Sequence, residues 1–536
     1  MENNRTILAI ALIILIWSGY SMLFPPQPPP AKIAPEVAVE QGAVKSEVAP
    51  QTQVISKDVA VSAQPIVAPT VEKRIRVESD LYSYELTTSG ARLRQAILKK
   101  YKVDNLPGAV PIDIVQVDAP HLATFKTTGV EGFSLSAETP YALKDEQSEY
   151  FLSDGDSQVL TFVATTPAGL EIHKSYRFQA DSYEIDLSVK LINRTPQQMQ
   201  GGLDLSLINY WEDSRKGDTY NFVGPTTLVG EELEEDDPED LQTSSKSYAK
   251  NVIWSGFFTK YFTSIVSPQG EAAKKIHVEM GDGYVENRFS SPALVLEPNE
   301  GTSLDYVVYL GPKDYDTLKA AGHQFERAID LGFFSIIAQP LMVALKFFHG
   351  YLGNWGFAIV LLTVCIKAIF WPLTQKSYSS MKAMQKLQPQ MAKMREKYSS
   401  DKQRLNTEMM ALYKEHRVNP FGGCLPILIQ IPVFFALYQV LLGSIELRHA
   451  PFMLWITDLS AKDPYYVTPL VMGATMFLQQ KMSPTTMEPM QAKMMMMMPV
   501  VFTFLFLNFP SGLVVYWLVN NVLTIAQQYL INRKPA

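Results

Sequence analysis

The sequence predicts a polytopic α-helical membrane protein with a large all-β domain outside the cytoplasm. Long apolar runs fill roughly the last 200 of the 536 residues, whereas most of the first 312 carry polar and apolar residues in short alternation. The only two cysteines, Cys365 and Cys424, stand in apolar stretches, so no disulfide framework supports the β part. That part is long enough to be stabilised by a hydrophobic core of its own.

The chain begins with an apolar run that is long enough to cross a bilayer, over residues 7–24 after Arg5. A cleaved signal peptide is the alternative, but a Pro-rich stretch follows at once and no clear small-residue cleavage site precedes it. We therefore expect an uncleaved anchor over residues 1–24. Residues 25–71, rich in Pro, Ala, Val and Gln, are expected to form an extended linker.

Residues 72–312 are predicted to form the β domain. Polar and apolar residues alternate with period two in residues 183–189 and 304–309, among others. Turn signals such as Gly281-Asp282-Gly283 separate these runs. Many short strands at this spacing favour an antiparallel sandwich.

Five further apolar runs are candidate membrane spans, and the charges between them set their orientation. The runs are residues 355–371, 425–442, 465–478, 494–509 and 512–531. Residues 375–418 carry ten Lys or Arg against four Asp or Glu, a net charge of +6, and short basic loops stay in the cytoplasm. With the anchor, this predicts six spans, both termini in the cytoplasm and the β domain on the opposite side.

The segment between the β domain and the next span, residues 313–350, is predicted to lie along the membrane surface. Residues 315–331 have the spacing of an amphipathic helix. Residues 333–348 are apolar, but Gln339 and Pro340 interrupt them. A span at this place would move the +6 loop out of the cytoplasm, so we expect an interfacial helix.

The basic loop, residues 375–418, is predicted to form a helical hairpin, with a kink at Pro389. Its Met residues recur at intervals of three and four, which fits a small core seam or a soft surface for varied apolar partners. Its charges have two explanations: they set the membrane topology and keep the loop soluble, or they bind anionic lipid or ribosomal RNA. We single out six cationic residues as a cytoplasmic contact region: Lys382, Lys386, Lys393, Arg395, Lys402 and Arg404.

One cation, Lys367, lies inside a predicted span. A lysine at mid-bilayer costs about 2.5–3.5 kcal/mol, and this one is close enough to the cytoplasmic end to reach the interface. Polar residues accompany it in its own span and in others: Thr363 one turn earlier, Gln430 in the third span, and the face of the last span formed by Tyr516, Asn520, Thr524 and Gln527. Isolated polar groups often join helices. A whole polar face with a charge indicates a hydrophilic groove that opens to the cytoplasm.

The chain lacks the motifs of a pump or a hydrolase. None of the six predicted spans contains Asp, Glu or His, which disfavours proton-coupled transport. The sequence has no Walker A motif, no His/Cys ligand cluster and no nucleophile elbow. We therefore expect no enzyme, no catalytic residue, no cofactor and no metal site.

Several long blocks of the sequence resemble the YidC family of membrane protein insertases. They are NWGFAIVLLTVCIKAIFWPLT, LQPQMAKMREKY, DKQRLNTEMMALYKEHRVNPFGGCLPILIQIPVFFALY, ELRHAPFMLWITDLSAKDPYY, QKMSPTT and FPSGLVVYWLVNN. The resemblance implies a bacterial inner (cytoplasmic) membrane protein with a periplasmic β-supersandwich. It also implies that residues 351–536 form a five-helix core around a hydrophilic groove, closed toward the outside and open to the cytoplasm and lipid.

The resemblance implies roles for single residues as well. The family's positively charged groove residue corresponds to Lys367, where many bacterial members carry Arg; Lys keeps the attraction but lacks the bidentate fork. Thr363, Gln430, Tyr516 and Trp517 match groove positions. Residues 376–417 match the first cytoplasmic region of the family and residues 482–493 the second.

The function that these observations favour is that of an insertase and chaperone for integral membrane proteins, acting alone or with the Sec translocon and without nucleotide. Expected partners are nascent membrane proteins, the Sec translocon, the ribosome and anionic lipid, with no nucleic acid beyond ribosomal RNA. The alternative is a membrane-tethered periplasmic carbohydrate-binding protein, whose β domain would need a cleft with aromatic residues and paired carboxylates. A channel is a third possibility.

Overall fold

The computed structural model describes residues 72–115, 122–145, 147–212, 215, 222–398, 401–416, 418, 425–483 and 489–533. These residues belong to one compact unit, Val67–Ala536. The predicted anchor, residues 1–24, and the predicted linker, residues 25–71, lie outside the described residues.

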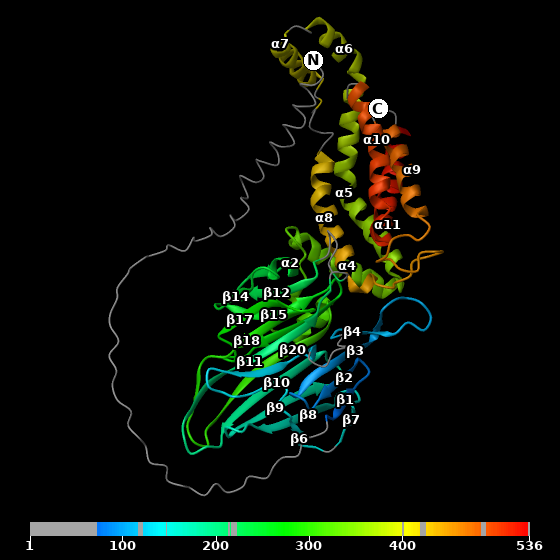
Figure 1. The fold of residues 1–536 in the computed structure, drawn as a ribbon. Coiled ribbons are helices and arrows are strands. Elements are labelled where there is room, and N and C mark those ends of the chain that lie inside the picture. The colour runs from blue at the N-terminus through cyan, green and yellow to red at the C-terminus, as the bar shows by residue number, and fades with distance from the viewer. Residues whose placement is uncertain are drawn as a thin grey trace, which may run out of the picture. The chain divides into compact units, whose positions relative to one another are not determined.

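The first part of the described chain is a β domain of three sheets (Figure 1). The strands are β1 (Arg74–Glu78), β2 (Tyr82–Thr87), β3 (Arg92–Lys102), β4 (Pro111–Asp113), β5 (Lys126–Val130), β6 (Ala142–Leu143), β7 (Glu149–Phe151), β8 (Ser157–Thr165), β9 (Leu170–Gln179), β10 (Glu184–Asn193), β11 (Met199–Tyr210), β12 (Gly224–Val229), β13 (Glu232–Glu235), β14 (Lys246–Tyr248), β15 (Val252–Phe258), β16 (Phe262–Pro268), β17 (Lys275–Gly281), β18 (Tyr284–Ser290), β19 (Leu294–Leu296) and β20 (Gly301–Pro312). Their orders are β4-β3-β2-β1-β7, β13-β12-β15-β16-β20-β10-β9-β8-β6 and β14-β17-β18-β11-β19, with β5 also paired to β11. The described strand pairs are antiparallel, as predicted, except that β1 and β7 are parallel.

The period-two pattern has the predicted physical cause. Strands β9 and β10 bury every second residue for most of their length, because one face of their sheet packs on the core and the other meets solvent. Two stacked tyrosines of β2 join this core to the smaller sheet: Tyr82 donates to the Gln179 carbonyl at 2.8 Å, and Tyr84 to the Leu310 carbonyl at 3.4 Å. The hydroxyls of these two tyrosines thus have partners, and both rings belong to the main core of the β domain.

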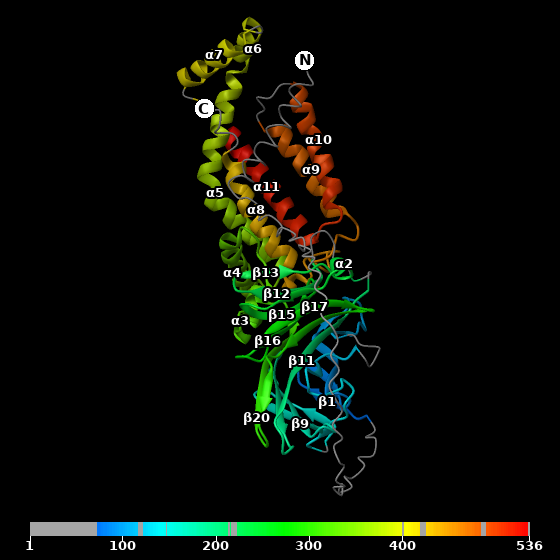
Figure 2. The same cartoon turned by 60° about the vertical axis from the view of Figure 1, so that its left-hand side comes forward.

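The second part is helical. Its helices are α3 (Tyr315–Ala321), α4 (Ser335–Leu352), α5 (Trp355–Lys386), α6 (Gln388–Lys397), α7 (Lys402–Glu415), α8 (Leu425–Gly443), α9 (Val467–Met482), α10 (Pro489–Phe506) and α11 (Ser511–Arg533), while the short α2 (Pro238–Leu241) belongs to the β domain. Figures 1 and 2 show α5, α8, α9, α10 and α11 side by side. These five helices carry the five predicted spans that follow the β domain.

The segment predicted as one amphipathic helix over residues 315–331 is instead broken. Helix α3 ends where Gly322 has a φ of 76°, and a 3-10 turn, Phe325–Ala328, follows Gln324, whose φ is 58°. Left-handed backbone cannot continue an α-helix, so the prediction of a continuous helix was wrong. Its amphipathic character is nevertheless present, because Leu318 and Phe325 are buried in a core cluster with Trp254.

Pro340 does not interrupt helix α4, which runs through it. A proline removes the hydrogen bond to the carbonyl four residues earlier, here that of Ile336. Ile336 is the second residue of α4 and is 86% exposed, so the lost bond falls in the first turn of the helix. The apolar segment around the proline is therefore one helix.

The predicted kink at Pro389 is a complete break. Helix α5 continues from its membrane-spanning part to Lys386, and Pro389 lies in the first turn of α6, where a missing N–H costs little. Residues 375–386 are thus the end of α5 rather than part of a separate hairpin helix. The hairpin consists of α6 and α7, and Leu387, Met391 and Leu412 are buried between them with Met394 and Met409 partly buried. The small-core interpretation of these Met residues is confirmed.

Among the described residues, one helix, Trp355–Lys386, is long and apolar enough to cross a membrane by itself. Two shorter apolar helical segments, Gln430–Gly443 and Met494–Phe506, accompany it. Large apolar side chains are exposed along α8, α9 and α10, which is unusual for a protein surface in water. They are Ile431, Phe435, Leu470, Val471, Phe477, Leu478, Met494, Met495, Met496, Met497, Met498, Val500, Val501, Phe504 and Leu505.

Candidate functional site

The start of α5 fixes the helix that carries Lys367. The side chain of Asn354 caps the helix by accepting a hydrogen bond from Phe357 N at 3.1 Å. The same side chain donates to the carbonyls of Pro451 and Phe452, at 3.2 and 3.0 Å. Gly356 gives close access to the Phe452 ring, since a Cβ there would lie 1.9 Å from it. Helix α5 is therefore held in one position at this end.

Lys367 meets the last helix directly. Its ammonium donates to Thr524 Oγ1 at 2.8 Å, and this hydroxyl donates in turn to the Asn520 carbonyl one turn earlier, at 2.6 Å. Lys367 is half-buried and Thr524 is buried. The predicted association of the charge with the polar face of α11 is thus present in the structure.

Gln430 joins the same polar face from α8. Its amide nitrogen donates to Asn520 Oδ1 at 3.1 Å, and both side chains are half-buried. Lys367, Thr524, Asn520 and Gln430 therefore form one polar cluster, contributed by α5, α11 and α8.

Tyr516 borders this cluster, because its side chain hydrogen-bonds with Gln430 while its ring is buried in the core of the helical region. Two other predicted groove residues lie outside the cluster. Thr363 is buried, and its hydroxyl donates to the Ile359 carbonyl of its own helix at 2.7 Å. Trp517 packs on Phe434 of α8 and Phe506 of α10, with ring centroids 4.8 and 5.0 Å apart. Since α11 begins at Ser511, this aromatic packing lies nearer its N-terminal end than the polar cluster does.

Sequence reasoning missed a second polar stripe on α11, formed by Asn521 and Gln528. Asn521 donates to Thr475 Oγ1 of α9 at 3.3 Å. Gln528 donates to the Tyr378 hydroxyl of α5 at 2.7 Å and to Ser483 Oγ at 2.9 Å. The signal was available, because two residues seven apart lie on one helical face.

The polar cluster has a single charge. None of α5, α8, α9, α10 and α11 contains Asp or Glu. Lys367 therefore donates to an uncharged hydroxyl, that of Thr524, and has no carboxylate on these helices to neutralise it. Such a site attracts negative charge and offers hydrogen bonds to polar groups in an otherwise apolar region.

The predicted cytoplasmic contact residues lie on α5, α6 and α7. Lys386, Lys393 and Arg404 are exposed, whereas Lys382 and Arg395 are half-buried. Arg404 lies over the Tyr398 ring at 5.5 Å from its centroid. The side chain of Lys402 lies outside the described part of the structure.

Two family models match the chain. The model described as "YidC periplasmic domain" matches residues 74–344, and the model described as "60Kd inner membrane protein" matches residues 347–536. The membrane protein insertase YidC of Geobacter sulfurreducens is 46% identical over 536 residues and covers 99% of this chain and 98% of its own. The protein of the same name from Geotalea uraniireducens is 44% identical over 535 residues, with 99% of each chain covered.

Two solved structures are similar at lower identity. A crystal structure of an active YidC insertase is 16% identical, with a TM-score of 0.37 over 86% of this chain and 93% of the other. A galactose mutarotase related enzyme from Lactobacillus acidophilus is 8% identical, with a TM-score of 0.32 over 44% and 97%. Both TM-scores are below 0.5, so the assignment rests on the family models and the full-length relatives. By these matches, the chain belongs to the YidC family of membrane protein insertases.

Proposed function

We propose that this insertase acts through the polar cluster around Lys367, which receives the polar flank of a client segment from the cytoplasm. The observation that carries the proposal is the hydrogen bond from Lys367 to Thr524. It lies among helices, α5, α8, α9, α10 and α11, that contain no acidic residue. An uncompensated cation attracts acidic or polar flanks, and the surrounding amides and hydroxyls replace some of their lost water. The flank then crosses a shorter hydrocarbon path.

The apolar part of the client is proposed to leave along α8 and α10. Both helices expose large apolar side chains, among them Phe435 and Phe504. Transfer of an apolar segment into lipid is favourable by about 0.8 kcal/mol per buried methylene, so the step needs no nucleotide. Trp517 and its aromatic neighbours are proposed to close the groove on the side away from the cytoplasm.

The chain is an inner-membrane insertase with a periplasmic β domain. We further propose six spans with both termini in the cytoplasm. Support comes from the net charge of +6 over residues 375–418, which contain the α6–α7 hairpin. Helix α4, which carries Gln339, Lys346 and His349 among mostly apolar residues, is proposed to lie along the interface.

The substrates of this insertase are membrane proteins. The Sec translocon and the ribosome are proposed as partners, with anionic lipid at the cytoplasmic surface. The exposed cations Lys386, Lys393 and Arg404 support an electrostatic role for the hairpin, since phosphates of lipid or ribosomal RNA would pair with them.

The test is insertion of a single-span client into liposomes that contain only this purified protein. Two versions of the client are compared, one with an acidic flank and one with a neutral flank. Lys367→Glu is expected to slow the acidic-flank client by about tenfold or more and the neutral one less, whereas Lys367→Arg keeps most of the rate.

A matched control is Lys274→Glu, which makes the same charge change on an exposed residue of the β domain. Equal rates for wild type and Lys367→Glu with the acidic-flank client would refute the attraction model. The carbohydrate-binding alternative is tested in the same liposomes by deleting residues 72–294, which that alternative requires to be essential.

A further inference from the structure

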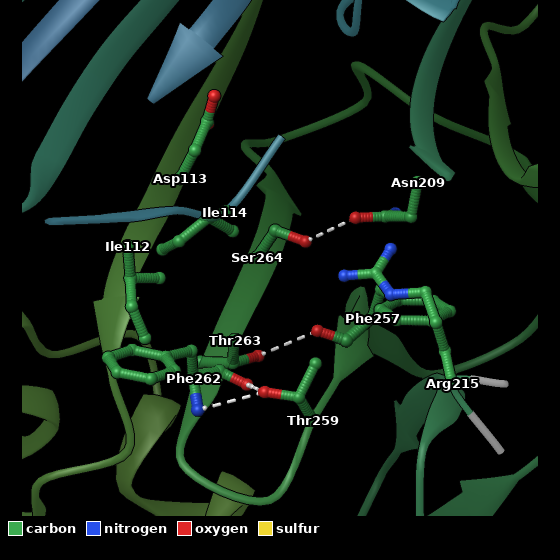
Figure 3. Close-up of a pocket in the computed structure, with 10 residues that line it drawn as sticks. All are labelled: Ile112, Asp113, Ile114, Asn209, Arg215, Phe257, Thr259, Phe262, Thr263 and Ser264. Atoms are coloured by element: carbon green, nitrogen blue, oxygen red, sulfur yellow. Dashed lines mark hydrogen bonds between the residues drawn. The ribbon is translucent and has the colours of Figure 1, made fainter. Parts of the chain in front are cut away.

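A cavity of about 140 Å³ lies inside the β domain, in a part of the chain separate from the polar cluster of the helices (Figure 3). It lies among β4, β11 and the β15–β16 hairpin. Its lining residues are Ile112, Asp113, Ile114, Asn209, Arg215, Phe257, Thr259, Phe262, Thr263 and Ser264.

One wall carries a buried amide whose donors are unused. Asn209 is only 5% exposed, and its Oδ1 accepts a hydrogen bond from Ser264 Oγ at 2.9 Å. Its Nδ2 is buried and has no hydrogen-bond partner within the described chain. A buried donor without a partner is unfavourable, so this nitrogen is available to an acceptor that enters the cavity.

A guanidinium lies next to this amide. Arg215 donates through one terminal nitrogen to the Tyr210 carbonyl at 2.6 Å and lies over the Tyr210 ring. Figure 3 shows its guanidinium directed at the space between Ser264 and Asn209. Burial lowers the pKa of Arg215, against the opposing effect of Glu212, but an arginine stays charged at any physiological pH.

The other polar groups of the wall do not compete for these donors. The hydroxyls of Thr259 and Thr263 donate to the carbonyls of Phe262 and Phe257, at 3.0 and 3.2 Å. The carboxylate of Asp113 accepts from the backbone nitrogens of Ala96 and Val115. Figure 3 shows it pointing away from Arg215.

The rest of the wall is apolar. Ile112 and Ile114 are half-buried, and Phe257 and Phe262 are buried. A cavity with two nitrogen donors at one side and aliphatic and aromatic walls at the other suits an anion with an apolar body. It suits a free phosphate less well, because phosphate would leave several oxygens against these walls without donors.

We propose that this cavity binds a carboxylate with a small apolar body, with the carboxylate oxygens on Asn209 Nδ2 and the Arg215 guanidinium. The carboxylate belongs either to a free short-chain organic acid or to the C-terminal residue of a peptide. The site is independent of the insertase groove proposed above.

The proposal is tested with the full-length protein in nanodiscs by saturation-transfer NMR. The probes are butyrate and N-acetyl-glycyl-valine, each compared with its uncharged amide. Saturable binding is expected for at least one of the two acids and for neither amide. Binding of butyrate alone assigns the site to free acids, and binding of the peptide acid assigns it to chain ends.

Two variants test the assigned contacts. Asn209→Asp keeps the oxygen that accepts from Ser264 but places a carboxylate beside Arg215, and Arg215→Gln removes the cation. Each is expected to weaken binding of the acid by about tenfold or more. Asn299→Asp, which adds the same charge on an exposed turn, is expected to leave binding unchanged. The proposal is overturned if neither acid binds wild type, if the amides bind equally well, or if Asn209→Asp binds like wild type.

Discussion

The ammonium of Lys346 lies 2.8 Å from a carboxylate oxygen of Glu446, and this contact joins α4 to the 3-10 turn that follows α8. Asp314, which caps α3, and Asp316, in the first turn of that helix, lie 2.9 and 2.8 Å from the same ammonium. Burial alone would lower the pKa of Lys346, but the carboxylates outweigh it and raise that pKa above its ordinary value. One cation therefore fastens the end of the β domain to two helical elements.

Replacement of this cation should loosen α4. In Lys346→Gln, the largely buried carboxylate of Glu446 loses its partner, at a cost of about 1–3 kcal/mol. Amide hydrogen exchange is expected to become faster in Ser335–Leu352 and to stay the same in β9. Lys319→Gln, at an exposed position of α3, serves as the control. Unchanged protection of α4 would show that its packing alone holds it.

The carboxyl of Asp236 should make the β domain less stable as the pH rises. Burial raises the pKa of Asp236 to about 6 from an ordinary value of 3.8, although hydrogen bonds from Tyr248 act in the opposite direction. The folded state thus binds a proton that the unfolded state has already lost, so stability falls between about pH 4 and pH 6, by at most about 3 kcal/mol. Above pH 6 the cost is complete.

Asp236→Asn removes this ionisation and still accepts from Tyr248. The variant should show slower amide exchange than wild type in Gly224–Val229 at pH 7, with the difference vanishing toward pH 4. Comparison at each pH cancels the intrinsic effect of pH on exchange. A constant difference at all pH values would assign the effect to packing instead of ionisation.

Gly473 allows α9 to approach α10 closely. A Cβ at this position would lie 1.9 Å from Thr503 Oγ1. Gly473→Ala should therefore force the helices apart, cost about 1–3 kcal/mol and lower the Tm of the detergent-solubilised protein. Gly443→Ala is the control, since a Cβ there meets nothing within 4 Å.

A second variant checks that the contact itself causes the loss. Adding Thr503→Ala to Gly473→Ala removes the hydroxyl and leaves the Cβ at 3.1 Å as the nearest atom of that side chain. The double variant should recover part of the Tm that Gly473→Ala loses. Strictly additive losses would mean that the two side chains do not meet.

The exposed cations of α5, α6 and α7 should bind anionic membranes. Replacing Lys386, Lys393 and Arg404 together by Gln is expected to weaken binding of nanodisc-embedded protein to anionic vesicles by about 1 kcal/mol per charge, with a smaller salt dependence. Replacement of the exposed Lys190, Lys274 and Lys275 of the β domain provides a variant with the same net charge. An equal effect of both triple changes would indicate non-specific attraction.

Local patterns predicted much of the fold. The alternation along β9 and the apolar run of α5 each depend on neighbours in the sequence, because the periods of strands and helices are properties of the backbone. The wrong prediction for residues 315–331 also has a local cause. The breaks of residues 315–331 come from Gly322 and Gln324 in left-handed backbone, which apolar periodicity does not report.

The sequence by itself determined that the chain has a β part and a membrane part, that the loop after Lys367 is basic, and that Lys367 stands on helices without an acidic residue. Only the tertiary structure decided its partner, Thr524, which is 157 residues away. It likewise decided that Asn521 and Gln528 join α11 to α9 and α5, and that Asn209 and Arg215 share one cavity. The physical reason is that periodicity places a side chain on a face, whereas the packing of whole helices and sheets decides what that face meets.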